Sequence, residues 1–364
     1  MHTPLELIKS ALRRRKLDGL LVTQPENRRY LSGYSATDTS IAESSGVLLI
    51  PVKGQPILMT DSRYQLQAES EAAGFEVLLY QRNLIGSLQN ILPARGIHRI
   101  GFESHYVLHK TAVALADMAR KHSLEPVPVS GLVERLRVIK NSEELGRIRK
   151  AVALNEEVFQ EVYGGLRPGQ TEQQVAMTIE MTMRAKGAEG PSFETIVAGG
   201  PNSAHPHAVP TDRPLREGEP IVIDMGTRLG GYCSDMTRTV VLGQPDEKTV
   251  ELVRLVRKAQ RAAVNTIRAG VTAQEADRSA RRIIAGQGYG KQFGHGLGHG
   301  VGLAVHEPPA LNKRSRRKLA AGMVVTVEPG IYLPGWGGIR LENMVVVREN
   351  GCEILNLDTT FLDI

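Results

Sequence analysis

Three histidines and four glycines crowd into one stretch of thirteen residues, HGLGHGVGLAVHE at positions 295–307. A helix is disfavoured there because each interior glycine costs about 1 kcal/mol relative to alanine. The absence of an HExxH pattern also excludes the helical zinc-protease motif. Glycines can instead let backbone approach another group closely. The stretch is therefore either a metal or catalytic site, or a flexible loop with incidental histidines. Five of the ten histidines of the chain lie between His205 and His306, which favours a site.

Two aspartates flank a predicted hairpin, PIVIDMGTRLGGYCSDMTRTVVL at positions 220–242. If Gly230 and Gly231 form a two-residue turn, the register makes Asp224 and Asp235 diagonal neighbours on one face of the sheet. Carboxylates inside otherwise apolar strands are costly unless they are neutralised. Either this face of the sheet is exposed to solvent, or the two aspartates hold a cation.

The glutamates Glu328 and Glu342 repeat this situation nearer the C-terminus. Glu328 ends the apolar strand MVVTVE, and Glu342 lies within a second predicted strand, GGIRLENMVVV. Strand alternation puts Arg340 on the same face as Glu342, so an ion pair is the alternative to a metal there. Buried carboxylates are rarely left unpaired. The four carboxylates offer oxygen ligands that suit hard or borderline divalent ions.

This set of residues predicts a hydrolase. Four carboxylates and one histidine would suit two divalent ions that share bridging carboxylates. Such a pair of ions acidifies a bridging water to hydroxide near neutral pH. Nearby histidines could then hydrogen-bond the oxyanion of a tetrahedral intermediate. Amide hydrolysis is the natural use of such a site.

A faint internal repeat indicates which elements position these residues. LRPGQTEQQVA begins at Leu166 and IRAGVTAQEAD begins at Ile267, 101 residues later, with Arg, Gly and Thr at matching places. Thr171 and Thr272 each precede a Gln or Glu by three residues, which is the spacing of a capping box at the start of a helix. Apolar strands follow both copies. We therefore expect two similar halves, each with helices and antiparallel strands.

The N-terminal part alternates short apolar runs with helical patterns, as a small α/β domain does. Strands are expected at 18–23, 46–51, 76–80 and 99–103, and helices at 62–73 and 109–122. The spacing of Asn141 and Glu144 predicts a capping box that begins the next unit. We place the boundary near residue 133, which divides the chain into domains 1–133 and 134–364.

The composition is that of a globular protein, with 41% hydrophobic and 23% charged residues in a chain of 364, enough for two domains. No run approaches the about 18 apolar residues of a transmembrane helix. The N-terminus has no apolar signal region, and two cysteines make no disulfide framework. We expect a cytoplasmic protein with no membrane partner. The basic run Lys313–Lys318 lacks interleaved aromatics, so no nucleic-acid partner is expected either.

The order Asp224, Asp235, HGLGHGVGLAVHE, VEPG and RLEN resembles the dinuclear metallopeptidases of the pita-bread fold, and among them the two-domain prolidases and Xaa-Pro aminopeptidases. The resemblance implies a creatinase-like α/β N-terminal domain followed by an α+β pita-bread catalytic domain with a pseudo-two-fold internal repeat. It also implies an exopeptidase that hydrolyses the Xaa-Pro bond of proline-containing peptides or dipeptides by a metal-bridging hydroxide. A homodimer is implied as well.

The same resemblance assigns five metal ligands, which would be Asp224, Asp235, His299, Glu328 and Glu342. Asp235 and Glu342 would bridge two divalent ions, with manganese expected first and cobalt or zinc as alternatives. Glu328 would also shuttle protons. Arg340 would lie behind the ligands and steady Glu342.

Further residues match the substrate-binding positions of these families. His207 and His306 would contact the scissile peptide and the transition state, and His295 and Tyr332 would lie in the substrate pocket. His205 stands where relatives often have an apolar residue, so it receives no role.

Two other functions on the same fold remain as alternatives: a metal-free creatinase-like hydrolase of small molecules, and a non-catalytic binding protein. Both would be expected to lose ligands or the two histidines at 207 and 306, and this chain keeps them. Methionine aminopeptidases share the ligand set, but the additional N-terminal domain disfavours them. A dipeptidase and an aminopeptidase both stay open, because they differ in how the ends of the pocket are closed.

Overall fold

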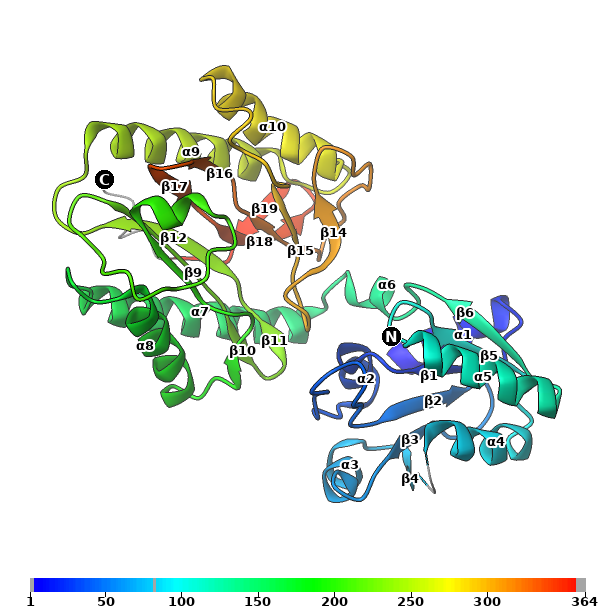
Figure 1. Cartoon of the computed structure of the whole chain (residues 1–364). Coiled ribbons are helices and arrows are strands. Elements are labelled where there is room, and N and C mark those ends of the chain that lie inside the picture. The colour runs from blue at the N-terminus through cyan, green and yellow to red at the C-terminus, as the bar shows by residue number, and fades with distance from the viewer. Residues whose placement is uncertain (1–2, 81–82, 358–364) are drawn as a thin grey trace. The chain divides into compact units, whose positions relative to one another are not determined.

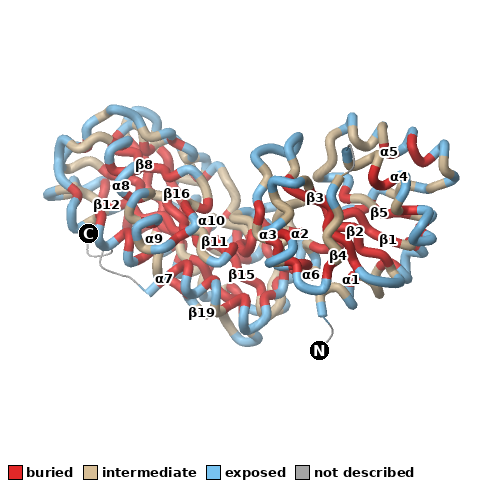
Figure 2. The backbone as a smooth tube through the Cα atoms, turned by 90° about the horizontal axis from the view of Figure 1, so that it is seen from below, coloured by how far each residue is buried: buried red, intermediate tan, exposed pale blue. Residues whose placement is uncertain are grey.

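The computed structural model describes residues 3–80 and 83–357. These residues form two compact units that divide between Arg137 and Val138. Figure 1 shows the order of the elements, and Figure 2 shows that strands form the buried interior of each unit. Within the described residues, no helix is both long enough and apolar enough to span a membrane.

The division lies a few residues beyond the expected one. Val133 packs in the core of the N-terminal unit, and the short helix α6 (Glu134–Arg137) follows it directly. The side chains of Glu134 and Arg137 both hydrogen-bond Asn27, at 2.7 Å each. These contacts keep α6 in the N-terminal unit. The capping box at Asn141 marks only where the next helix begins, so it could not show to which unit α6 belongs.

The N-terminal unit is a three-layer α/β structure around a six-stranded sheet of order β4-β3-β2-β1-β5-β6. Its strands are β1 (Gly19–Val22), β2 (Val47–Pro51), β3 (Ile57–Thr60), β4 (Glu76–Leu79), β5 (Arg99–Glu103) and β6 (Glu125–Val129). Its other helices are α1 (Pro4–Arg14), α2 (Pro25–Ser32), α3 (Gln65–Glu71), α4 (Leu84–Ala94) and α5 (His109–His122). Strand alternation sends Leu20 into the core with α1, α2 and α3, and Leu21 into the core with α4 and α5.

The four strands expected from the apolar runs are confirmed, as is the helix at 109–122. The helix expected at 62–73 is shorter, because α3 covers only Gln65–Glu71. The strand β6, with the sequence EPVPV, was not expected. It lies at the edge of the sheet, where proline is tolerated because one side of the strand needs no ladder hydrogen bonds.

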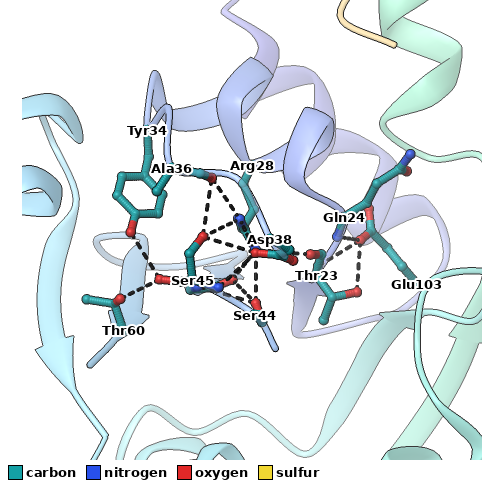
Figure 3. A network of polar contacts seen from close by, with 11 residues as sticks. Thr23, Gln24, Arg28, Tyr34, Ala36, Asp38, Ser44, Ser45, Thr60 and Glu103 are labelled. Carbon is teal, nitrogen blue, oxygen red and sulfur yellow. Dashed lines mark hydrogen bonds and ion pairs between the residues drawn. The ribbon is translucent and has the colours of Figure 1, made fainter. Parts of the chain in front are cut away.

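A buried arginine holds the loop after α2 (Figure 3). The guanidinium of Arg28 lies 2.8 Å from the Asp38 carboxylate, and neither side chain is more than 2% exposed. The same guanidinium donates to Ser45 Oγ at 2.7 Å and to the Gly46 carbonyl at 2.5 Å. A buried charge needs such partners. These hydrogen bonds to Arg28 therefore hold the loop in place.

The C-terminal unit is α+β. Its helices are α7 (Ser142–Gly164), α8 (Glu172–Ala185), α9 (Glu247–Thr266) and α10 (Ala273–Gly286). The strands of its first half are β7 (Gly190–Pro191), β8 (Ile196–Gly199), β9 (Pro220–Met225), β10 (Thr227–Leu229), β11 (Tyr232–Cys233) and β12 (Met236–Val241). Those of its second half are β13 (Gly298–Gly300), β14 (Glu307–Leu311), β15 (Val324–Val327), β16 (Gly330–Leu333), β17 (Gly337–Arg340), β18 (Asn343–Arg348) and β19 (Gly351–Ile354). The pair α7–α8 contacts β7, β8, β10 and β11, whereas α9–α10 contacts β14, β15, β17 and β19 (Figure 1).

The internal repeat is confirmed by the backbone. The helices α8 and α10 both have 14 residues, and both begin with the expected capping box, at Thr171 and at Thr272. In the turn before each helix, Gly169 and Gly270 both have a φ of 88°, in the left-handed region that favours glycine. Each of these glycine amides donates to a leucine carbonyl 2.9 Å away. The two halves therefore share local geometry as well as element order.

Candidate active site

Each half of the C-terminal unit contributes two carboxylates from one antiparallel pair of strands. Asp224 lies in β9, and Asp235 directly precedes its partner β12. Leu229 pairs with Tyr232 and Met225 with Met236, which confirms the predicted hairpin register.

In the second half, Glu328 directly follows β15 and Glu342 directly precedes its partner β18. The single strand expected across residues 337–347 is wrong. It is two strands, β17 and β18, which lie in different sheets and are separated at Leu341 and Glu342. This break puts Glu342 at the start of a strand and not in its middle.

These carboxylates and the histidines meet in one cavity of about 500 Å³. Its wall includes all five expected ligands: Asp224, Asp235, His299, Glu328 and Glu342. His207, His295, His306 and Arg340 line the same cavity. Nine of the ten expected site residues therefore come together from segments that are far apart in the sequence.

The geometry of three of these side chains fits a divalent cation. Asp235, His299 and Glu342 each present a ligand atom, and these atoms lie within 4.8 Å of one another. His299 Nε2 is also 3.4 Å from a Glu328 oxygen. Asp224 Oδ1 and Glu342 Oε1 are buried without a hydrogen-bond partner. Buried carboxylate oxygens without a proton donor are expected where a cation is to be held.

The electrostatics of the cavity also favour a cation. Burial raises the pKa of Glu328 to about 7. Burial, with the neighbouring carboxylates, raises the pKa values of Asp235 and Glu342 well above the ordinary range. Burial lowers the pKa of His299 to about 4, so its imidazole is neutral, which is the form that binds metals. A dication would remove the penalty of keeping these carboxylates charged.

Two threonines orient the glutamates, and the sequence interpretation missed both. Thr237 donates to Glu342 at 2.7 Å. Thr326 donates to Glu328 at 3.0 Å and accepts from the amide of His299 at 3.0 Å. Because Thr326 precedes Glu328 by two residues, it lies on the same face of the strand. That alternation was the signal that could have found it.

Arg340 contacts a different ligand from the one expected. Its guanidinium lies 2.6 Å from Asp224 and 2.9 Å from the Tyr332 hydroxyl, and no hydrogen bond or ion pair with Glu342 is found among the described residues. Although burial opposes the charge, Tyr332 and Asp224 raise the pKa of Arg340 well above its ordinary value. A direct pair with Glu342 is absent because the break after β17 ends the strand alternation on which it rested. Arg340 reaches Glu342 through Thr237, whose hydroxyl accepts from the guanidinium at 3.0 Å and donates to Glu342 at 2.7 Å.

Tyr332 lies behind the cavity wall and not in it. Its hydroxyl is 3.0 Å from His295 Nε2, and its side chain is 8% exposed. Burial lowers the pKa of His295 to about 4 and raises that of Tyr332 to about 12. Both groups are therefore neutral at pH 7, and Tyr332 connects His295 to Arg340.

His207 and His306 face the cavity from two loops and are exposed. The His306 ring lies 4.3 Å from the His299 ring. Partial burial of the ring and the nearby His207 lower the pKa of His306, so a neutral imidazole is favoured there. His205 is exposed and its ring contacts the Asn202 carbonyl at 3.1 Å, away from the residues that line the cavity.

The glycines of the histidine stretch let its backbone lie close to the backbone of neighbouring strands. A Cβ at Gly298 would lie 2.2 Å from the Thr326 carbonyl oxygen, and one at Gly300 would lie 2.4 Å from the Pro308 carbonyl oxygen. These glycines let β13 fit between β14 and β15 and carry His299 to the carboxylates. Residues 298–300 of the stretch form the strand β13 and residues 301–306 form a loop, so the flexible-loop hypothesis fails for His299, which lies in the strand.

The family model for metallopeptidase family M24 matches residues 146–349. The chain belongs to this family. Residues 4–139 match the model for the creatinase/prolidase N-terminal domain. As an M24 metallopeptidase the protein is a metal-dependent hydrolase, and its two units have the fold that the sequence motifs implied.

Relatives of this M24 metallopeptidase align along nearly the whole chain. An uncharacterized peptidase of Bacillus subtilis is 39% identical over 95% of this chain and 96% of its own. The structure of an Xaa-Pro dipeptidase from Bacillus anthracis has a TM-score of 0.91 at 37% identity, covering 98% of this chain and 97% of its own. That of an X-Pro aminopeptidase from Thermotoga maritima has a TM-score of 0.86 at 36% identity, covering 96% and 98%.

Proposed function

We propose that this protein is an exopeptidase that hydrolyses the bond between an N-terminal residue and proline, in dipeptides or in longer peptides, with two bound divalent ions. The observation that carries the proposal is the single cavity in which four carboxylates and His299 lie beside His207 and His306. The similarity to an Xaa-Pro dipeptidase and an X-Pro aminopeptidase supports the proline specificity.

The five ligands Asp224, Asp235, His299, Glu328 and Glu342 would hold the two ions. We propose manganese, with cobalt or zinc as substitutes, because oxygen-rich ligand sets suit hard and borderline ions. When bound, the ions would polarise the scissile carbonyl and lower the pKa of water.

The chain's own residues would manage the protons and the oxyanion. Glu328 would accept a proton from the attacking water and return it to the leaving proline nitrogen. His207 and His306 would hydrogen-bond the peptide as its carbonyl oxygen gains charge. His306 fits this role as a neutral donor at the cavity surface.

The apolar part of the cavity wall would receive the proline ring. Phe193, Ile196 and Ala208 line it. His295 lies at the same wall and is braced from behind by Tyr332, as a substrate-pocket residue should be. A rigid apolar wall near a few placed polar groups is typical of small-ligand sites.

We further propose that the protein acts as a homodimer in the cytoplasm. This part rests on the resemblance to prolidases and Xaa-Pro aminopeptidases. Light scattering after size-exclusion chromatography tests the dimer, and cell fractionation tests the location.

The decisive experiment compares Ala-Pro with Ala-Pro-Ala after EDTA treatment and after Mn²⁺ is added back. Metal-restored cleavage of Ala-Pro alone would indicate a dipeptidase, and cleavage of the tripeptide an aminopeptidase. If neither is cleaved while Mn²⁺ is measurably bound, the proline specificity is wrong and another amide is the substrate.

A further inference from the structure

The segment 200–210 carries His207 to the cavity without belonging to the sheet. It leaves β8 at Gly199, and its only regular structure is a short 3-10 turn, Gly200–Ala204. His207 itself is exposed. Some group outside the segment must therefore fix its position, because loops ordered only by their own backbone are mobile.

Glu172, the first residue of α8, clasps both ends of this segment. Its side chain is fully buried. One carboxylate oxygen accepts from the Gly199 amide at 2.8 Å, just before the segment. The other accepts from the Thr211 amide at 2.9 Å and the Thr211 hydroxyl at 2.7 Å, just after it. Asn202 Nδ2, within the segment, donates to the same oxygen at 2.8 Å.

A single carboxylate thus satisfies four donors. Hydrogen bonds to an ionised acceptor are about twice as strong as neutral ones. An amide in place of the carboxylate would turn an NH₂ group toward donors and leave some of them unpaired. Arg340, which donates to the Pro206 carbonyl at 3.0 Å, supports the middle of the segment. The Gly338 amide also donates to Ser203 Oγ in the segment, at 2.8 Å. The clasp at the two ends and these contacts from β17 hold the segment on which His207 lies.

The internal repeat indicates that helix formation does not require this glutamate. The first residue of α10, at the corresponding place in the second half, is Ala273. The backbone contact is similar in both halves, because Glu172 and Ala273 each donate through the amide to an arginine carbonyl, at 3.1 and 2.9 Å. The start of the helix and this backbone contact therefore form without a carboxylate. The buried Glu172 side chain instead bonds donors at Gly199, Asn202 and Thr211, at the ends of the segment and within it.

We infer that Glu172 is a positioning residue for His207. It acts by closing the segment 200–210, and it does not touch substrate or metal. Only one part of this inference rests on the proposed function: the expectation that a displaced His207 slows peptide hydrolysis.

The test uses the full chain with Glu172→Gln, and Gln174→Ala as the matched control. Gln174 accepts from the Thr171 amide at the same helix start and does not contact the segment. We expect E172Q to lower kcat/KM for Ala-Pro about 10- to 100-fold, because a small displacement of a catalytic contact has effects of this size. Mn²⁺ affinity should stay unchanged, and Q174A should keep normal activity.

A double mutant separates positioning from general damage. If Glu172 acts through His207, E172Q combined with His207→Ala should be no slower than His207→Ala alone. An additional loss in the double mutant, or an equal loss in Q174A, would overturn the inference. If E172Q does not fold, Thr211→Val removes one donor of the clasp and should give the same pattern with a smaller effect.

Hydrogen exchange supplies a readout that does not depend on activity. Backbone amides of residues 199–211 should exchange faster in E172Q than in the parent protein, with exchange elsewhere unchanged. Unchanged exchange in that peptide would overturn the inference even if activity fell. If the parent protein cleaves neither peptide, the proposed function fails, and the exchange result alone decides whether Glu172 holds the segment.

Discussion

The Arg340 guanidinium lies 2.6 Å from Oδ2 of Asp224, and the two residues come from different halves of the catalytic unit. This pair occupies one oxygen of the aspartate and leaves Oδ1 buried without a hydrogen-bond partner. Tyr332 holds the arginine from the other side at 2.9 Å. Asp224 is therefore oriented without a bound metal, and its Oδ1 is left available to act as a ligand.

Removing this arginine should weaken metal binding. For Arg340→Met we expect a loss of Mn²⁺ affinity of about 10- to 100-fold, because groups that orient metal ligands contribute to this extent. Isothermal titration calorimetry measures it. Arg149→Met, which breaks a pair with Glu353 at the surface, is the control and should bind Mn²⁺ normally. An unchanged affinity in R340M would show that Asp224 needs no orientation.

Metal affinity should rise with pH. Burial raises the pKa of Glu328 to about 7, and the pKa values of Asp235 and Glu342 are raised as well. Because a carboxylate must lose its proton to act as a ligand, protons compete with Mn²⁺ below that pH. We expect weaker binding at pH 6 than at pH 8. Titrations in buffers of different ionisation enthalpy should reveal proton release, and pH-independent binding without release would contradict the raised pKa values.

The glycine at 298 should tolerate no side chain. Gly298→Ala puts a Cβ 2.2 Å from the Thr326 carbonyl oxygen, which forces β13 away from β15 and displaces the neighbouring His299. Such overpacking costs about 1–3 kcal/mol or more. We expect lost Mn²⁺ binding and a lower urea midpoint. Gly294→Ala, just before the stretch and with nothing within 4 Å of its added Cβ, is the control and should behave like the parent.

Arg28 should be essential to the stability of the N-terminal unit. Arg28→Met leaves Asp38 as a buried charge without its partner, and breaking a buried pair in this way costs about 3–5 kcal/mol. Urea unfolding followed by circular dichroism measures the change. Arg63→Met breaks a pair whose arginine is 71% exposed, and it should leave the unfolding curve unchanged. Equal effects of the two substitutions would rule out a special role for the buried pair.

Local rules were enough to predict much of the site. The turn at Gly230 and Gly231 sets the hairpin register, and that register alone puts Asp224 and Asp235 on one face. The capping boxes at Thr171 and Thr272 identified the repeat because they depend only on residues three apart. Such features follow from backbone geometry over a few residues.

Contacts between the two halves could not be predicted in this way. Arg340 pairs with a residue 116 positions away, and only the packing of β17 beside β9 brings the two together. Strand alternation pointed instead to Glu342, two residues along, and the break in the strand made that expectation wrong. The clasp at Glu172 lies within the first half, and it was missed because its partners are 27 to 39 positions away.

Because each half supplies two of the four carboxylates, neither half can bind the metal ions by itself with the full ligand set. Metal binding is therefore linked to the docking of the halves, and each occupied site stabilises their union by mass action. A chain in which only one half of the catalytic unit has been made lacks two of the four carboxylates and would have no peptidase activity. The hydrolase therefore becomes active in a cell only after both halves of its catalytic unit have been made and have folded together.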